Sequence, residues 1–372
     1  MSPAGRERQS GMRIVFFLFG SLEMNSGGFL YDRKLVGYLR SAGHRVDVVP
    51  LPWLDYYPSE AQLDSVWSRV RQLDPDDYDL ILQDELAHPV LCRLNPWLRQ
   101  WGVPIASIVH HLHCSEEGSI ADTCRAMFHE DIYLAGVDGF VLNSKATYVS
   151  IRNLTGSDRP FIIAPPGSDR FEPRFDEESL KKKSFEPGPL RVLFAGNIIP
   201  RKGLHTLISG LRKVPHGDWR LSIAGGWEFD PQYAGEIKRR IRDNGLDSRI
   251  DVLGHVDDEV LEALLEQAHV LAVPSFYEGY GIIYAEAMGF GLPAIGCRVG
   301  GVPEIVQHGL NGFLIKPGDD AALARHLGAL HADRKLLAEM GIAAHHFSLS
   351  LPTWEQSLHQ AAGFLEKMAC GS

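Results

Sequence analysis

The chain has 372 residues, enough for two domains, and its 45% hydrophobic and 23% charged residues are typical of a globular protein. The formal net charge of −10 at pH 7 argues against nucleic acid as a partner, because phosphate contacts need clustered Lys and Arg. Five scattered cysteines without a CxxC spacing argue against a disulfide framework and favour a reducing compartment.

Targeting and membrane-spanning patterns are not found in the sequence. No apolar run reaches the roughly 18 residues that span a bilayer, and the opening residues MSPAGRERQSG lack the apolar stretch of a signal peptide. We therefore expect a cytoplasmic protein. A peripheral contact with the inner face of the membrane stays open, since a local basic patch is enough for one.

The first half of the sequence alternates apolar runs with helical patterns. Residues 13–20 (RIVFFLFG) predict a strand, 29–44 a helix that ends at Gly43, and 45–51 the next strand. Four more strands are predicted at 78–85, 104–111, 137–144 and 161–167. Continuous apolar strands are typical of a parallel sheet that helices cover on both faces.

A charged segment rich in turn residues, 168–189, then interrupts the alternation and predicts a surface linker. The alternation restarts with predicted strands at 190–197, 219–226, 250–256, 268–275 and 293–299. We predict two doubly wound, Rossmann-like α/β domains that face each other across a cleft, with ligands at the C-terminal ends of the strands. The predicted organisation is residues 1–172 as the first domain, 173–189 as the linker, 190–352 as the second domain, and a helix at 353–372 that packs back on the first domain.

Two acids stand in an otherwise apolar, glycine-rich stretch, YEGYGIIYAEAMGFGLP at 277–293. Glu278 is predicted on a loop, and Glu286 one turn inside a helix that begins near Ile282. The first amides of a helix favour an anion, and carboxylates accept hydrogen bonds from diols, so the pattern suits a sugar nucleotide. The alternative is that Glu286 is a core acid paired with a structural Arg or with backbone amides.

A basic pair lies at a second predicted strand end, in FAGNIIPRKGLHTLI at 194–208. Arg201 and Lys202 stand just before Gly203, where a helix is predicted to begin. A lysine in such a position is commonly just exposed. Together with the acid pair in the same half of the chain, the two cations suit a diphosphate.

These motifs in this order resemble the C-terminal domain of the GT4-type retaining glycosyltransferases of the GT-B fold. The acids Glu278 and Glu286 match the E-x7-E element of that family. In the first half, SGGFLYDRKLVGYLRSAGHRVDVV, SIVHHLHCSE, VDGFVLNSKA and APPGSDRF are similar to the landmarks of the N-terminal domain. The resemblance covers nearly the whole chain from residue 12.

The resemblance implies roles for individual residues. Glu286 is expected to bind the nucleotide ribose, and Glu278 the hydroxyls of the donor sugar. Lys202 is expected to contact the diphosphate, which backbone amides also cradle. The donor-binding set expected in full is Gly27, Gly28, Asn197, Arg201, Lys202, Glu278, Gly279, Tyr280, Gly281, Ile282 and Glu286. Asn197 departs from the family pattern, which often has Arg there, and Arg201 is expected to supply the missing charge.

The HHLHC run at 110–114 raises the question of a metal site. Adjacent side chains point apart and no second ligand cluster has a recognised spacing, so we expect no metal. The resemblance instead places His110 beside the donor sugar, with a histidine satisfied by backbone as the alternative. His111, Asp84 and Glu85 are candidates for the acceptor site, although the two acids could equally cap a turn.

The implied reaction moves a hexosyl group from a nucleoside diphosphate sugar to an acceptor hydroxyl and retains the anomeric configuration. Glu278, His110 and Lys202 are the expected catalytic residues. No cofactor and no metal are expected; the donor is UDP- or GDP-linked, and the acceptor is a glycan, a lipid-linked sugar or a small molecule. The state of association is predicted to be monomer or homodimer.

Two other functions remain open at this stage. A sugar-nucleotide epimerase of the same fold is one, because fold does not fix the reaction. A nucleotide-binding protein without turnover is the other, although the first predicted strand is not followed by the GxGxxG of a dinucleotide site.

Overall fold

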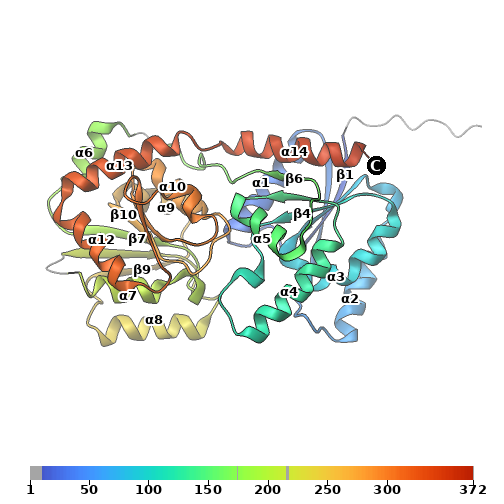
Figure 1. Cartoon of the computed structure of the whole chain (residues 1–372), viewed down its shortest axis with the longest axis horizontal. Coiled ribbons are helices and arrows are strands. Elements are labelled where there is room, and N and C mark those ends of the chain that lie inside the picture. Colours follow the sequence, from blue (N-terminus) through green and yellow to red (C-terminus); the bar gives the residue numbers. More distant parts are fainter. Residues whose placement is uncertain (1–10, 174, 215–217, 372) are drawn as a thin grey trace, which may run out of the picture. The chain divides into compact units, whose positions relative to one another are not determined.

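Figure 1 shows the computed structural model of the chain, which describes residues 11–173, 175–214 and 218–371. The chain divides into two compact units. One runs to Pro166 and takes in the segment from Trp354, and the other comprises Gly167–Thr353. Each unit contains a six-stranded sheet, and all neighbouring strands pair in parallel. The predicted fold class, two α/β domains built on parallel sheets, is confirmed.

The sheet of the first unit has the strand order β2-β1-β3-β4-β5-β6. Its strands are β1 Arg13–Phe19, β2 Arg45–Leu51, β3 Leu80–Asp84, β4 Ile105–Val109, β5 Gly139–Leu142 and β6 Phe161–Ile163. Its helices are α1 Gly27–Ser41, α2 Glu60–Val70, α3 His88–Leu98, α4 Ile120–Ala135, α5 Lys145–Thr155 and α14 Trp354–Cys370, with 3₁₀ turns η1 Pro75–Asp77, η2 Glu85–Ala87, η3 Arg99–Trp101 and η4 His113–Ser115. The C-terminal helix α14 packs on α1 and β6, where Trp354 lies against Tyr31.

The sheet of the second unit has the order β12-β11-β10-β7-β8-β9. Its strands are β7 Leu190–Ala195, β8 Trp219–Ala224, β9 Ile250–Gly254, β10 Val270–Val273, β11 Ala294–Cys297 and β12 Gly312–Ile315. Its helices are α6 Glu177–Ser184, α7 Leu204–Leu211, α8 Pro231–Asp243, α9 Asp258–Gln267, α10 Ile282–Gly289, α11 Val302–Ile305, α12 Asp320–Ala332 and α13 Arg334–Ser348, with the 3₁₀ turn η5 Pro200–Lys202.

Both sheets contain a point where the strand order reverses, and this point positions the candidate sites. In the first unit it lies between β1 and β3, and in the second between β7 and β10. Loops that leave such neighbouring strands diverge to opposite faces, which opens a crevice at the C-terminal edge of the sheet. The loops after β1, β3 and β4 therefore share one edge, and those after β7 and β10 share another.

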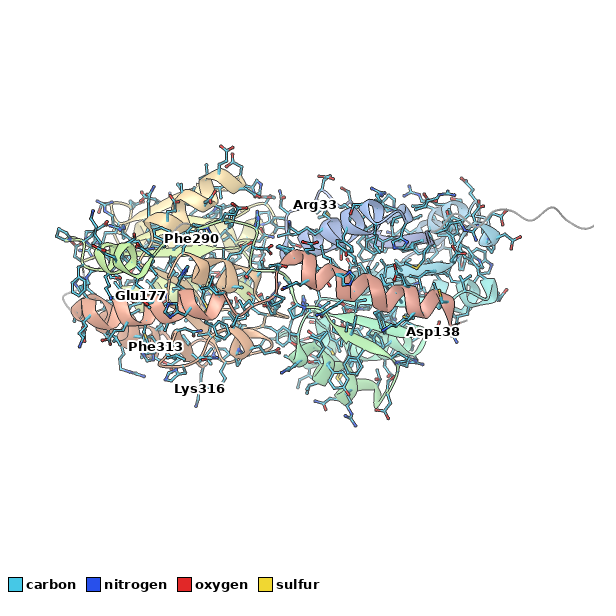
Figure 2. All side chains as sticks on the ribbon, turned by 90° about the horizontal axis from the view of Figure 1, so that it is seen from above. Arg33, Asp138, Glu177, Phe290, Phe313 and Lys316 are labelled. Carbon is cyan, nitrogen blue, oxygen red and sulfur yellow. The ribbon has the colours of Figure 1, made fainter. Side chains whose placement is uncertain are left out.

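The predicted strands correspond to β1–β11, while β12 was not predicted. Helix α10 begins at Ile282, as predicted, because Gly281 before it adopts φ 93°, a left-handed conformation that glycine tolerates. The segment 173–189, in which we expected a linker, belongs to the second unit and contains α6. Lys183 on α6 is buried, and its Nζ donates to the carbonyl of Phe290 at 2.9 Å. Phe290 is labelled in Figure 2. A surface linker would leave the basic run Lys181–Lys183 solvated, and at Lys183 this expectation was wrong.

Within the part of the chain that the structure describes, no helix is both long enough and apolar enough to cross a membrane.

Gly300 of the second unit lies in close contact with the loop after β10. Gly300 has φ 48°, and a Cβ at this position would lie 1.8 Å from the carbonyl oxygen of Glu278. We predict that Gly300→Ala lowers the free energy of unfolding by about 3 kcal/mol, since left-handed strain and overpacking act together. Urea-induced unfolding measures this loss.

The matched control is Gly245→Ala. Gly245 has a similar left-handed φ of 62°, but no heavy atom lies within 4 Å of the Cβ that alanine would add. The control should lose only the conformational component, about 1–2 kcal/mol. Equal losses in the two variants would contradict the close approach at Glu278.

Candidate functional site

The second unit brings the predicted acid and the predicted cations together at the β7/β10 edge. Lys202 Nζ lies 2.6 Å from Glu278 Oε1, and Arg201 Nη1 lies 3.9 Å from Glu278 Oε2. The hydroxyl of Ser275 also donates to Oε1, at 2.7 Å. Burial raises the pKa of Glu278, but Lys202 and Arg201 outweigh this effect and hold it below its ordinary value. The acid is therefore a carboxylate bound to two cations.

The two loops of this edge are tied to each other through their backbones. The amide of Phe276 donates to the carbonyl of Arg201 at 2.7 Å, and Arg201 Nη1 donates to the carbonyl of Tyr277 at 2.9 Å. The carbonyl of Glu278 accepts from the amide of Gly301 at 3.0 Å. These bonds fix the carboxylate on the loop after β10 against the cations on the loop after β7.

The N-terminus of α10 follows directly and presents backbone donors. In the described residues, the N–H groups of Tyr280, Gly281 and Ile282 have no hydrogen-bond acceptor. The N-cap residue Gly281 carries no side chain that could satisfy them. Orphan amides at a helix N-terminus, together with the helix dipole, favour an anion.

Glu286 has a different cation partner. It lies on α10 with its side chain 2% exposed, and its Oε1 is 3.3 Å from Arg170 Nη1. Arg170 also forms an ion pair with Asp258 at the start of α9. The alternative stated for Glu286, a buried acid paired with an arginine, thus describes what is observed. A role in ribose binding stays a prediction.

The remaining predicted donor residues occupy the expected loops. Asn197 follows β7, and its carbonyl accepts from the amide of Ile199 at 3.0 Å. Gly279 is buried next to Glu278. In the first unit, Gly27 opens α1 and is exposed, whereas Gly28 packs against the ring of His110. A Cβ on Gly28 would lie 3.0 Å from His110 Cδ2, so the glycine at this position also makes room for the histidine.

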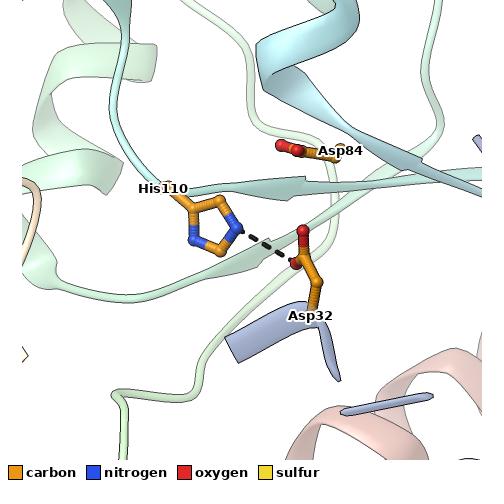
Figure 3. A group of neighbouring side chains, drawn as sticks. All are labelled: Asp32, Asp84 and His110. Atoms are coloured by element: carbon orange, nitrogen blue, oxygen red, sulfur yellow. Dashed lines mark hydrogen bonds and ion pairs between the residues drawn. The ribbon is translucent and has the colours of Figure 1, made fainter. Parts of the chain in front are cut away.

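In the first unit, His110 meets a buried acid that we did not single out from the sequence. Its Nε2 lies 3.1 Å from Oδ1 of Asp32 on α1, and Asp84 at the end of β3 lies beside both (Figure 3). Asp32 is fully buried and Asp84 is 1% exposed. Burial lowers the pKa of His110, but Asp32, Asp84 and Glu85 outweigh this and raise it to about 9. The imidazole is therefore a cation at neutral pH.

The backbone carbonyl of His110 is already engaged by the protein. It accepts from Asn143 Nδ2 at 2.6 Å and from Thr147 Oγ1 at 3.5 Å. The single hydroxyl proton of Thr147 is shared with Asn143 Oδ1, which lies closer, at 2.8 Å, and this contact orients the amide. Both residues lie at the C-terminal end of β5 and the start of α5.

The other predicted residues of this edge contact protein groups. His111 Nε2 lies 2.6 Å from Glu116 Oε1, and His113 lies 3.8 Å from the other oxygen of the same acid. His111 and His113 thus face one carboxylate, Glu116, whereas His110 faces another, Asp32. Asp84 accepts from the amide of Leu86 at 3.0 Å and caps η2.

Glu85 faces a second buried cluster. It lies 3.3 Å from His88 Nδ1, and Glu130 on α4 completes the group. Glu130 accepts from the amides of His113 and Cys114. Burial raises the pKa of Glu85 to about 8 and, with the help of Glu85, that of Glu130 to about 7. Both this cluster and the group of Asp32, Asp84 and His110 have the residue types of metal ligands, so the absence of a metal stays a prediction.

Four site residues were missed in the sequence: Asp32, Asn143, Arg170 and Ser275. Arg170 and Asn143 lie within motifs quoted above, APPGSDRF and VDGFVLNSKA, so the resemblance could have found them. Asp32 lies in a predicted helix, where a charged residue is expected to be exposed. Its burial depends on which face of α1 packs on the sheet, and the sequence does not show this.

The buried acid pair predicts a pH dependence of stability. Because Glu85 and Glu130 bind protons more tightly when folded, their contribution is complete below about pH 4.5 and is lost as pH rises through 7 to 8. The melting temperature should fall between pH 5 and 8.5, and Glu85→Gln should reduce that fall. Differential scanning fluorimetry across this range measures it.

Glu117→Gln, which alters an exposed acid just after η4 in the same unit, serves as the control and should keep the wild-type slope. An unchanged slope in Glu85→Gln would show that the two acids do not titrate in this range.

Comparison with known proteins places this geometry in a family. Residues 175–347 match the family model described as glycosyl transferases group 1. The chain is 32% identical over 279 residues to a GDP-mannose-dependent alpha-(1-6)-phosphatidylinositol monomannoside mannosyltransferase of Mycolicibacterium smegmatis, covering 71% of this chain and 70% of that protein. It is 30% identical over 311 residues to the D-inositol 3-phosphate glycosyltransferase of Nocardia farcinica, covering 80% and 67%. For the namesake protein of Pseudarthrobacter chlorophenolicus, 28% identical over 256 residues, the matched part is 66% of this chain and only 60% of the relative.

Solved structures confirm the architecture. Sucrose-phosphate synthase of Thermosynechococcus elongatus superposes with a TM-score of 0.81 at 23% identity, covering 97% of this chain and all of that one. HepE of Anabaena, solved with UDP and glucose, superposes with a TM-score of 0.75 at 21% identity, covering 96% of this chain and 100% of that one. On the strength of the sequence relatives, this chain belongs to the group 1 glycosyl transferases, the GT4-type enzymes of the GT-B fold.

Proposed function

We propose that this glycosyltransferase moves a hexosyl group from a nucleoside diphosphate sugar to an acceptor hydroxyl with retention of the anomeric configuration. The observation that carries the proposal is the buried Glu278 carboxylate, held at 2.6 Å by Lys202 next to the open amides of α10. An acid that can bind sugar hydroxyls and a surface that can bind diphosphate thus meet at one strand edge.

The donor diphosphate is assigned to Lys202, Arg201 and the amides of Tyr280, Gly281 and Ile282. An ammonium group has three donors, so Lys202 can keep its bond to Glu278 and still bind a phosphate oxygen. Among the residues that the structure describes, the second carboxylate oxygen of Glu278, Oε2, has Arg201 at 3.9 Å as a side-chain neighbour. We assign this oxygen to the hydroxyls of the donor sugar.

The ribose is assigned to Glu286. Its Oε1 is paired with Arg170, and a carboxylate has about four lone-pair sites, so it can accept from the vicinal diol in addition to its protein partners. The GDP-mannose-dependent relative supports a nucleoside diphosphate sugar as the donor. The donor screen described below distinguishes UDP from GDP. The inositol phosphate and phosphatidylinositol mannoside relatives support a polyol or a glycolipid as acceptor.

In the proposed reaction, the bond between the anomeric carbon and the phosphate oxygen breaks, and its electron pair stays on that oxygen. The acceptor oxygen forms its bond to the anomeric carbon on the same face, and its proton passes to the departing phosphate. The transition state is oxocarbenium-like. Lys202, Arg201 and the helix-end amides stabilise the negative charge where it develops, so we propose a step without a metal or a protein nucleophile.

Screening UDP- and GDP-linked sugars by thermal stabilisation identifies the donor, and assays with polyol and glycolipid acceptors then follow transfer. We predict that Lys202→Ala lowers kcat/KM by 10²- to 10³-fold, because a donor at the developing charge is lost. Lys213→Ala, which removes an exposed lysine paired with Asp320, should keep wild-type activity.

The stereochemistry is read from the anomeric proton signals of the product. Retention supports the proposal, and an inverted product contradicts it. Epimerised donor in the absence of acceptor would favour the epimerase. Nucleotide binding that survives in Glu278→Ala, with no turnover in the wild type for any donor, would favour a binding protein.

A further inference from the structure

The ring of His110 is held from several sides. Asp32 binds its Nε2 at 3.1 Å, Gly28 packs against its Cδ2 edge, and Tyr31 meets it edge-on with ring centroids 5.7 Å apart. Asn143 fixes the backbone of the same residue through its carbonyl. A ring with these contacts cannot turn without breaking the bond to Asp32.

The bond to Asp32 is a bond between buried charges. Asp32 is fully buried on α1, and its other oxygen, Oδ2, has no hydrogen-bond partner in the described part of the chain. A buried carboxylate with so few bonds is costly unless a cation is next to it. Among the described residues, the titratable side chains that face His110 are Asp32 and Tyr31 from α1, Asp84 from β3 and Glu85 from η2. Burial raises the pKa of Tyr31, which keeps its hydroxyl neutral, so the groups here that can carry a charge at neutral pH are acids.

These contacts leave one polar atom of the ring for a ligand. Nε2 is taken by Asp32, and Nδ1 has no partner among the described residues, while the side chain is 14% exposed. In the protonated ring both nitrogens are donors. His110 therefore offers a charged N–H group at Nδ1.

We propose that Asp32 is a positioning residue for glycosyl transfer: it holds His110 by Nε2 so that the protonated ring presents Nδ1–H to a phosphoryl oxygen of the substrate. This inference rests on the proposed function. A charged donor prefers an anionic oxygen, and both the diphosphate of the donor and a phosphate on the acceptor are sources of one.

The proposal excludes His110 as a general base. A neutral ring bound to Asp32 through Nε2–H would have a lone pair at Nδ1 and could take the proton of the acceptor hydroxyl. The protonated ring cannot, so the acceptor proton must leave by another route, as it does when the departing phosphate takes it. The state of Nδ1 therefore separates two mechanisms.

The pH dependence of Asp32→Asn tests the role in catalysis. In the wild type, kcat/KM should stay constant with rising pH until about pH 9, where His110 loses its proton. In Asp32→Asn the alkaline fall should move down by at least one pH unit, with a loss of at least tenfold at pH 8 and a smaller loss at pH 6. Asp138→Asn alters an acid of the same unit, labelled in Figure 2, that is paired with Arg99, and it should leave the profile unchanged.

A spectroscopic measurement keeps the proposal testable if Asp32→Asn does not fold. In ¹⁵N-histidine-labelled wild-type protein at pH 7.5, both nitrogens of His110 should be protonated, and His110→Gln assigns the signals. An unprotonated Nδ1, superimposable pH profiles, or stoichiometric binding of Zn²⁺ or Mn²⁺ that is lost in Asp32→Asn would overturn the proposal. The metal is included because the ligand atoms of Asp32, Asp84 and His110 lie within 4.8 Å of one another.

Binding measurements distinguish the two sources of phosphate. At pH 8, weaker binding of UDP or GDP to Asp32→Asn assigns Nδ1 to the donor. Unchanged nucleotide affinity with a raised KM for a phosphate-bearing acceptor assigns it to the acceptor. Failure of the proposed function is recognised separately, since no donor would then give transfer in the wild type while the ¹⁵N signals still report the state of His110.

Discussion

The pairing of Glu278 with Lys202 is the interaction on which the second unit's site depends. Moving a carboxylate out of water costs several kcal/mol unless cations and hydrogen bonds compensate. Lys202, Arg201 and Ser275 provide that compensation, yet Lys202 and Glu278 are 76 residues apart in sequence. They meet because β7 and β10 are neighbours at the point where the strand order reverses. The order of strands in the sheet therefore determines that Lys202 and Glu278 can form an ion pair.

The features that the sequence predicted well were local ones. Apolar runs and glycines located eleven strands and the start of α10, because each depends on a few neighbouring residues. The Glu278–Lys202 pair was predictable because both residues stand at strand ends, and strand ends of a parallel sheet share one edge.

The features that were missed depend on which distant elements meet. Asp32 and His110 are 78 residues apart, and Arg170 and Glu286 are 116 apart. Lys183 belongs to a basic run that would be expected to face solvent. Its ammonium group instead donates to the Phe290 carbonyl, because α6 packs against α13 in the folded unit. A charged residue in a polar pattern gives no signal of burial when its partner comes from another layer of the fold.

Each unit has a buried ion pair at the edge where its strand order reverses, but around that pair acids outnumber cations in the first unit and cations outnumber the acid in the second. At the β1/β3 edge, one imidazolium is paired with Asp32 and has two further buried acids beside it, so its own charge is largely compensated within the protein. At the β7/β10 edge, two cations, Lys202 and Arg201, stand around Glu278. The orphan amides of α10 add the positive end of a helix dipole. A chain with a net charge of −10 repels an anionic ligand at long range. At physiological ionic strength that field is screened beyond about 8 Å, so the cations near this edge act on a nearby ligand more strongly than the net charge does. This is why we propose the edge as the place where the diphosphate binds.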